Sequence, residues 1–203
     1  MIEEIKRRLA EYSSRPSLEP WRAKASVLVP LHQHSEDVFV VLTKRSEKVA
    51  SHKGEISFPG GAVDPTDPDL RFTALRESHE EIGLAPSHVR IVGQLDEIVT
   101  ISNYHVTPYV GEIDPSVSPY EWRHEEFEVA EILEVPLSHL IDPENAVEMP
   151  RMRDGQMVLQ PGIRFGEHIV WGATWRILRN FLDVAVMPQG SAPVEGPTGA
   201  ASL

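Results

Sequence analysis

The sequence contains no cysteine among its 203 residues. This absence excludes disulfide bridges, a thiol nucleophile and a metal site built from thiolates. The first residues, MIEEIKRRLAEYSS, lack the basic start and apolar core of an export signal, and the chain has no apolar run long enough to span a membrane. We therefore expect a cytoplasmic protein.

Basic residues are scarce as well, with 19 Lys and Arg against 31 Asp and Glu and a formal net charge of -12. Proteins that bind nucleic acid or anionic membranes cluster Lys and Arg on one surface, so we expect neither partner. A phosphorylated small molecule remains compatible with this charge if metal ions lie between carboxylates and phosphates. The nine histidines show no spacing typical of zinc ligands, so we expect no zinc site.

Hydrophobic periodicity predicts one α+β or α/β domain over residues 1–186. Residues 187–203 are rich in Pro, Gly and Ala, and we expect them to be disordered. The expected helices cover 2–12, 68–82 and 171–183, and the expected strands cover 25–31, 37–43, 55–58, 89–100, 104–113, 127–135, 146–151 and 157–165. Pro108 favours an edge position for the strand that contains it.

The stretch FPGGAVDPTDPDLRFTALRESHEEIGL, residues 58–84, organises the chain. Asp67 is the expected N-cap of its helix, with Pro68 in the first helical position. Gly83 is the expected left-handed C-cap. Helical spacing places Phe72, Leu75 and Ile82 on an apolar face, and His79 on the same side as a packed structural residue.

Three carboxylates, those of Glu77, Glu80 and Glu81, cluster on the opposite face of this helix. Like charges at this spacing destabilise a helix by roughly 0.2–0.5 kcal/mol per pair. A divalent cation with oxygen ligands would reverse the sign of that interaction. The alternative is a solvated acidic face in which Arg76 pairs with Glu80.

This pattern resembles the Nudix box of pyrophosphohydrolases, on residues Gly61, Asp67, Arg76, Glu77, Glu80, Glu81, Gly83 and Leu84. The chain departs from the box in three places. Eight residues rather than seven separate Asp67 from Arg76, Asp67 replaces a Glu, and Ser78 replaces an aliphatic residue. The resemblance implies a mixed sheet between helices, with the box forming a loop, a helix and a loop beside the sheet.

The segment LTKRSEKVASHKGEISFPGG just upstream is similar to an extra motif of the coenzyme A pyrophosphatase branch of this family, on residues Leu42, Thr43, Arg45, Ser46, Gly54, Phe58, Pro59, Gly60 and Gly61. Ala50 stands where that branch has an Arg. The branch resemblance implies Arg45, Ser46, Lys53, Gly60 and Gly61 as substrate-binding residues.

The resemblance also implies hydrolysis of a diphosphate with Mg²⁺ or Mn²⁺, held by Glu77 and Glu81 with Glu80 as a third ligand. Arg76 would orient these glutamates. The base would be Glu77 or a residue of a later loop, for which Glu125, Glu126 and Glu128 are the candidates. The expected substrate is coenzyme A or an acyl derivative.

Two alternatives remain open from the sequence. Ala50 leaves room for another nucleoside diphosphate derivative such as ADP-ribose or NADH. A regulator that binds a nucleotide without turnover is the other alternative, although no box glutamate is missing. The family resemblance is also compatible with a homodimer.

Overall fold

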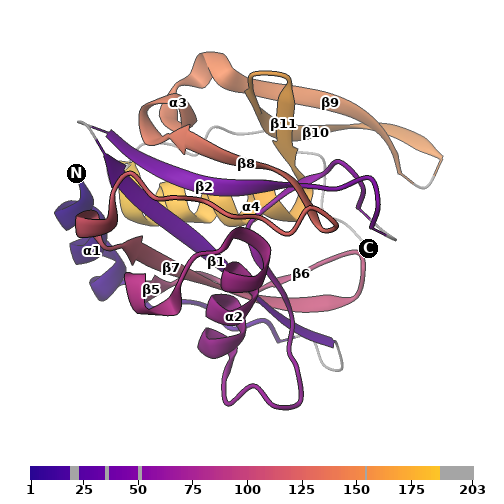
Figure 1. The fold of residues 1–203 in the computed structure, drawn as a ribbon. Coiled ribbons are helices and arrows are strands. Elements are labelled where there is room, and N and C mark those ends of the chain that lie inside the picture. The colour runs from indigo at the N-terminus through magenta and orange to yellow at the C-terminus, as the bar shows by residue number, and fades with distance from the viewer. Residues whose placement is uncertain (19–22, 35–36, 50–51, 154, 188–203) are drawn as a thin grey trace.

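An eight-stranded mixed sheet forms the centre of the protein (Figure 1). The computed structural model describes residues 1–18, 23–34, 37–49, 52–153 and 155–187. The strands of this sheet are β1 (Ala23–His34), β2 (Asp37–Arg45), β3 (Ile56–Ser57), β4 (Gly60–Ala62), β5 (Val89–Gln94), β6 (Ile98–Val99), β7 (Tyr104–Ile113) and β8 (Val129–Pro136). The main path runs β3-β2-β1-β7-β5, while β4 pairs with β1, β6 with β7 and β8 with β2. The predicted hairpin of β1 and β2 is confirmed, with Leu31 opposite Val40.

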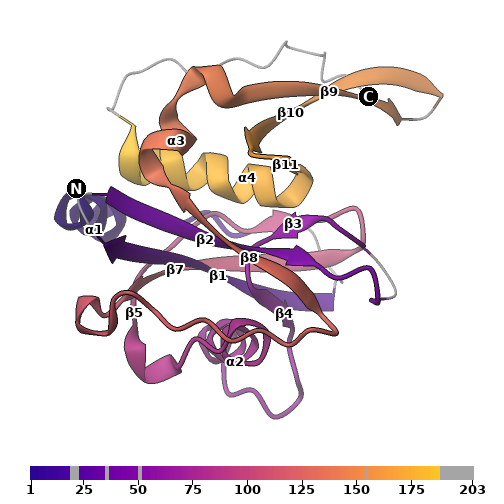
Figure 2. The same cartoon turned by 45° about the horizontal axis from the view of Figure 1, so that its top comes forward.

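Helices cover both faces of this sheet (Figure 2). On one face, α1 (Ile2–Glu11), α4 (Gly172–Phe181) and the π-helical turn η4 (Leu182–Val186) enclose the larger apolar core. On the other face, α2 (Leu70–Ile82) packs on a smaller core that includes Leu28, Val41 and Ile113. The predicted α+β sandwich is therefore confirmed.

A second, three-stranded sheet lies on the far side of α4 (Figure 2). It contains β9 (Ala146–Arg153), β10 (Gln156–Phe165) and β11 (His168–Trp171), and its hairpin turns at Gly155 with φ +79°. Asp154 lies outside the described residues. The short elements between the sheets and along the loops are α3 (Leu137–Ile141), η1 (Pro86–His88), η2 (Pro115–Val117) and η3 (Pro143–Asn145).

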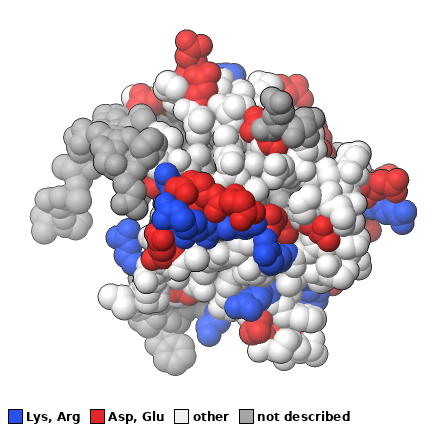
Figure 3. All heavy atoms as spheres, turned by 90° about the vertical axis from the view of Figure 1, so that its left-hand side faces the viewer, with Lys and Arg blue, Asp and Glu red and all other residues white. Residues whose placement is uncertain are grey.

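Helix α1 buries Ile2, Ile5 and Leu9 and turns its charged side to solvent. Figure 3 looks onto this end of the molecule, where acidic and basic side chains form one band. On α1 Arg7 pairs with Glu4 at 2.8 Å and with Glu11 at 2.9 Å. Within the described ranges, every helix is too short or too polar to cross a membrane.

Pro108 does not lie on an edge strand, so that prediction was wrong. Strand β7 pairs in parallel with β1 on one side and antiparallel with β5 and β6 on the other. The carbonyl of Pro108 accepts a hydrogen bond from the Leu95 N–H at 3.0 Å, where β5 has ended and β6 has not begun. The N and C=O of one strand residue point to the same side of the strand. The side on which Pro108 lacks an N–H therefore faces this gap between β5 and β6.

Candidate active site

Helix α2 begins later than the sequence pattern suggests. Its N-cap is Asp69, whose carboxylate accepts the Phe72 N–H at 2.8 Å, so the prediction of Asp67 as the cap was wrong. Asp67 instead accepts two hydrogen bonds from Arg76, Nε to Oδ1 and Nη2 to Oδ2, each 2.9 Å long. A bidentate guanidinium pair of this kind is geometrically specific, and it holds the loop before α2 against the middle of the helix.

The buried face of α2 also differs from the expectation. Phe72 is 47% exposed and His79 is exposed, so neither belongs to the core. The buried residues are Thr73, Ala74, Ser78, Glu81 and Ile82. Small side chains on this face bring α2 close to β1, and the Ser78 hydroxyl is satisfied by donating to the Ala74 carbonyl at 2.7 Å.

Gly83 ends α2 as predicted, in the left-handed region with φ +70°. Its N–H donates to the His79 carbonyl at 3.0 Å, and the Leu84 N–H donates to the Ser78 carbonyl at 3.3 Å. The bond from the Gly83 N–H to the carbonyl four residues earlier is that of an αL C-cap, which turns the chain sharply away from the helix. The carboxylates near the end of α2 therefore lie beside a tightly held turn.

The Glu77 carboxylate lies directly against the backbone of Gly61 on β4. A Cβ at position 61 would lie 2.5 Å from Glu77 Cδ, closer than any side chain can approach. Burial raises the pKa of Glu77 above its ordinary value, while Arg76 opposes the shift and the charges of Glu80 and Glu128 add to it. Glycine at position 61 is thus required for this carboxylate to reach the loop.

Glu81 is only 4% exposed, so it does not belong to the solvated acidic face that the sequence left open as an alternative. Its Oε2 accepts the Gly60 N–H at 3.1 Å, and its Oε1 lies 3.8 Å from Nη1 of Arg45. Burial raises the pKa of Glu81 to about 8, although the Gly60 N–H and the Arg45 guanidinium both oppose the shift. The ionised form of a carboxylate buried to this extent is stable only beside a positive charge.

Arg76 connects the carboxylates of the box. Its Nη1 lies 2.8 Å from Glu77 Oε1 and 3.1 Å from Glu80 Oε2. The Glu80 side chain is 58% exposed and is directed to Arg76. The most enclosed of the three predicted metal ligands are therefore Glu77 and Glu81.

The loop before β8 holds the predicted candidates for the base. The Glu125 N–H donates to the Glu81 carbonyl at 3.2 Å, and the Ser46 N–H donates to the Glu128 carbonyl at 2.8 Å. Of the three candidates, Glu128 is the one whose charge raises the pKa of both Glu77 and Glu81. All three candidates, Glu125, Glu126 and Glu128, are exposed to solvent.

The predicted substrate-binding residues occupy different environments. Arg45 ends β2 beside Glu81, and its buried Nε has no hydrogen-bond partner. Ser46 is buried, and its hydroxyl accepts the Lys48 N–H at 3.1 Å. Lys53 is exposed in the turn before β3, and Ala50 lies outside the described residues. Gly60 has φ +151°, and a Cβ there would lie 2.4 Å from the Ser26 carbonyl oxygen.

The family model described as NUDIX domain matches residues 22–152. The chain belongs to the Nudix family. Its relatives include an uncharacterized Nudix hydrolase NudL from Enterobacter sp. (strain 638), 36% identical over 168 residues that cover 82% of this chain and 85% of the relative. The NudL of Citrobacter koseri is 34% identical over 171 residues, with the same two coverages of 82% and 85%.

Among solved structures, the MutT/nudix family protein from Enterococcus faecalis superimposes with a TM-score of 0.56 over 89% of this chain and 73% of that one. The two sequences are 15% identical, so this likeness supports the Nudix fold and no finer conclusion. Together with the relatives, it identifies the chain as a Nudix hydrolase.

The Nudix hydrolases use divalent metal ions, and the carboxylates of this chain suit one. Glu77 and Glu81 stand one helical turn apart, and burial raises the pKa of both. Mg²⁺ and Mn²⁺ prefer oxygen ligands of this kind, usually with waters and substrate phosphates completing the shell. The protein compensates the negative charge of these carboxylates only in part, and a divalent cation would supply the remaining positive charge.

Sequence reasoning missed a second cluster of possible metal ligands. In the described part of the chain, one set of three His or acidic residues has ligand atoms within 4.8 Å of one another, and it consists of His32, His34 and Glu134. The expectation of no zinc site missed this cluster because Glu134 lies 102 positions from His32 in the sequence. Residues i and i+2 of a strand share a face, so the spacing of His32 and His34 indicates that both lie on one face of β1.

Proposed function

We propose that this Nudix hydrolase cleaves the diphosphate of coenzyme A or of its acyl derivatives with Mg²⁺ or Mn²⁺. The products would be adenosine 3',5'-bisphosphate and 4'-phosphopantetheine, or the acyl form of the latter. The observation that supports this proposal is the position of Arg45. It belongs to the upstream motif, yet its Nη1 lies 3.8 Å from Glu81 Oε1 in the box.

Arg45 is suited to bind a phosphate beside the box glutamates. Its buried Nε lacks a hydrogen-bond partner, and a guanidinium binds phosphate oxygens through several N–H groups at once. An unsatisfied buried donor costs about 1–3 kcal/mol, which a bound phosphate oxygen would recover. In this proposal Arg45 holds the diphosphate against Glu77 and Glu81.

The protein's own groups would then position the reaction. Glu77 and Glu81 would hold the metal ions, Arg76 would fix the Glu77 carboxylate, and the Gly60 N–H would orient Glu81. A bound divalent cation supplies neutralisation of phosphate charge and a more acidic water. Glu128 is the loop carboxylate best placed to accept the proton of the attacking water, because its charge acts on both box glutamates.

Two other functions compete with this proposal. Cleavage of ADP-ribose or NADH would use the same box and would not require a site for the 3'-phosphate of coenzyme A. A regulator that binds nucleotides without turnover would use the fold alone. All the acidic residues of the box core are present in this chain, which favours an enzyme.

Chromatographic product analysis with Mg²⁺ and, in parallel, coenzyme A, 3'-dephospho-coenzyme A, ADP-ribose and NADH tests the proposal. We expect adenosine 3',5'-bisphosphate, released from coenzyme A, to form fastest. Faster cleavage of ADP-ribose or NADH would overturn the substrate assignment, and no cleavage of any diphosphate would favour the regulator.

Two variants would sharpen the substrate assignment. Arg45→Gln should impair cleavage of coenzyme A and of 3'-dephospho-coenzyme A alike, because Arg45 lies beside the box. Lys53→Gln should raise KM only for coenzyme A if Lys53 binds the 3'-phosphate. Arg15→Gln is the matched control, since Arg15 is an exposed arginine that pairs with Asp96 at 3.1 Å, outside the site.

A further inference from the structure

A second polar cluster lies at the end of β1 opposite to the box. Residues Ser26 and Val27 of β1 pair with Gly61 and Gly60, whereas His32 and His34 are close to the end of the strand. Val27 and His32 are five positions apart, or about 16 Å along a strand. The cluster is therefore distinct from the box carboxylates.

Strand register brings the three residues of this cluster to one face of the sheet. His32 stands opposite Phe39 on β2, and Val41, two residues along β2, stands opposite Glu134 on β8. Opposed residues, and residues two apart in one strand, share a face. His32, His34 and Glu134 each offer a ligand atom within 4.8 Å of the other two.

The surroundings of His32 hold it in one orientation. It is 1% exposed, its Nδ1 contacts Glu134 Oε1, and its Nε2 lies 3.2 Å from the Ser118 Oγ. Histidines that bind a metal through one ring nitrogen usually have the other nitrogen fixed by such a neighbour. Ser118 would be that neighbour when Nδ1 faces a metal.

His34 and Glu134 are also supported, but they are less enclosed. The His34 ring stacks on Phe39 with centroids 4.0 Å apart and an interplanar angle of 6°. The Glu134 side chain is 30% exposed. The Trp122 ring lies edge-on to His32, and its Nε1–H helps to lower the pKa of Glu134.

We propose that His32, His34 and Glu134 form a site for a first-row transition-metal ion such as Zn²⁺. Two imidazoles and one carboxylate are a common zinc ligand set, and the fourth position is left for water. Metal–ligand bonds of about 2.0–2.2 Å separate tetrahedral ligand atoms by about 3.4 Å, which lies within the 4.8 Å spread of this cluster. Small rotations of His34 and Glu134 would complete the geometry.

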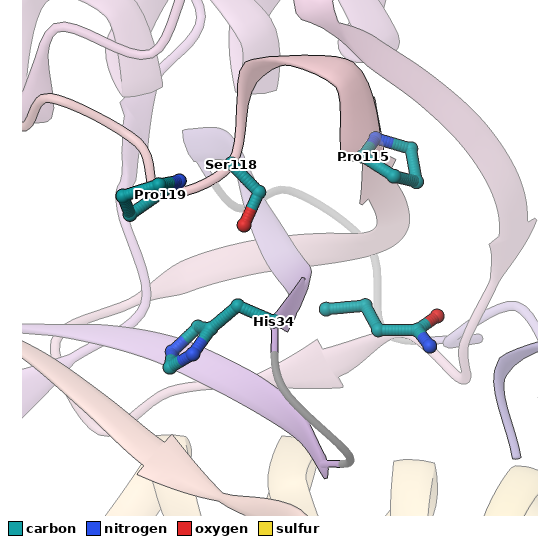
Figure 4. A pocket seen from close by; sticks show the side chains of 5 residues that line it. His34, Pro115, Ser118 and Pro119 are labelled. Atoms are coloured by element: carbon teal, nitrogen blue, oxygen red, sulfur yellow. The ribbon is translucent and has the colours of Figure 1, made fainter.

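The open position would face a pocket of about 640 Å³ lined by Gln33, His34, Pro115, Ser118 and Pro119. Figure 4 shows the Ser118 hydroxyl pointing into this space, with His34 on the opposite wall. Water can therefore reach the fourth position. A metal ion here would join β1 to β8 beside the loop that carries Ser118.

Metal titration of the full-length protein tests this site. The protein is stripped with EDTA, exchanged into buffer with excess Mg²⁺ to occupy the box carboxylates, and titrated with Zn²⁺ by calorimetry and with Co²⁺ by visible absorption. Mg²⁺ does not compete for imidazole, because it prefers oxygen ligands. We expect one equivalent of Zn²⁺ and the d–d absorption of tetrahedral Co²⁺.

The test variants are His34→Ala and Glu134→Gln, and both should weaken Zn²⁺ binding at least about tenfold and abolish the Co²⁺ band. His139→Ala makes the same change at a half-buried histidine whose Nε2 donates to the Arg164 carbonyl at 2.7 Å, and it should bind like the wild type. Circular dichroism of the metal-free variants shows whether they are folded. Equal binding by wild type and a folded His34→Ala variant, or no tight equivalent in the wild type, would overturn the proposal.

Discussion

Two clusters on the same face of the sheet shift the pKa of an enclosed carboxylate in opposite directions. In the box, burial raises the pKa of Glu81 to about 8 because Arg45 and the Gly60 N–H compensate its charge only in part. At the end of β1, burial would also raise the pKa of Glu134, but the hydrogen bond with His32 brings it below its ordinary value. The first cluster needs a cation from outside the protein, whereas the second already contains its own partner.

This difference also predicts which ions each cluster prefers. Glu77 and Glu81 offer only oxygen, which suits Mg²⁺ or Mn²⁺, while His32 and His34 offer nitrogen, which suits Zn²⁺. Changes in one cluster should therefore leave the other intact. Four experiments test the box, and the first also tests that separation.

Glu81→Gln should have the largest effect. We expect turnover to fall on the order of a thousandfold, because a metal ligand is worth several kcal/mol of transition-state stabilisation. The melting temperature should stay the same or rise, since the amide carries no buried charge. The measurement is a diphosphate-cleavage assay beside a thermal melt.

The control for this change is Glu112→Gln, which alters another buried glutamate that pairs with Lys6 at 3.3 Å. It should lower the melting temperature and preserve turnover. Zn²⁺ binding should survive both substitutions. Near-normal turnover of Glu81→Gln would remove Glu81 from the list of metal ligands.

Gly61→Ala should have the second-largest effect on turnover. The new Cβ would lie 2.5 Å from Glu77 Cδ and would push the carboxylate away. A displacement of about 1 Å in a catalytic group costs on the order of a hundredfold in rate. The assay is steady-state turnover as a function of Mg²⁺ concentration, in which the half-saturating concentration should also rise.

Gly155→Ala is the matched control for Gly61→Ala. Its φ is +79°, and nothing lies within 4 Å of the added Cβ, so it reports backbone strain without crowding. We expect a lower melting temperature and unchanged turnover. Equal turnover by the two variants would contradict the close contact between Gly61 and Glu77.

Asp67→Asn should reduce turnover about tenfold, because Asp67 fixes Arg76 and Arg76 in turn contacts Glu77. The guanidinium of Arg76 holds the pKa of Asp67 below its ordinary value of 3.8. Its contribution to stability is therefore present above about pH 4 and is lost as the pH falls through the folded-state pKa. Thermal melts at acidic pH should show a weaker pH dependence in Asp67→Asn than in the wild type.

The smallest effect concerns the metal-free protein. Because the folded-state pKa of Glu81 is about 8, above its ordinary value of 4.5, the neutral form stabilises the fold below pH 4.5. That stability is lost as the pH rises through about 8, so the melting temperature in EDTA should fall over this interval. Added Mg²⁺ should restore it, and Glu81→Gln should show neither the fall nor the restoration.

The sequence predicted most of the box because its residues are local. The Gly83 cap follows from a few adjacent positions, and the structure has it where it was expected. The N-terminus of α2 was misplaced because Asp67 and Asp69 are equally good caps, and only the tertiary contact with Arg76 separates them. Phe72 was misassigned because small residues, not large ones, face the sheet.

The second cluster could not be predicted from spacing. His32 and Glu134 are brought together by the pairing of β1 with β2 and of β2 with β8, and a one-residue slip in either register would separate them. The hairpin of β1 and β2 was predictable, but the pairing of β8 with the other edge of β2 was not. Strand order is a property of the whole chain.

The break between β5 and β6 opposite Pro108 lies where the segment after α1 and the helix α4 attach to the sheet. Residues 95–97 bulge out of the sheet there, and Asp96 accepts hydrogen bonds from the Tyr12 hydroxyl at 2.6 Å and from the Arg15 N–H at 2.8 Å. The Asp96 N–H in turn donates to Oδ1 of Asn180 on α4, at 3.0 Å. The break in the sheet opposite Pro108 thus holds one aspartate that ties the segment after α1 to helix α4.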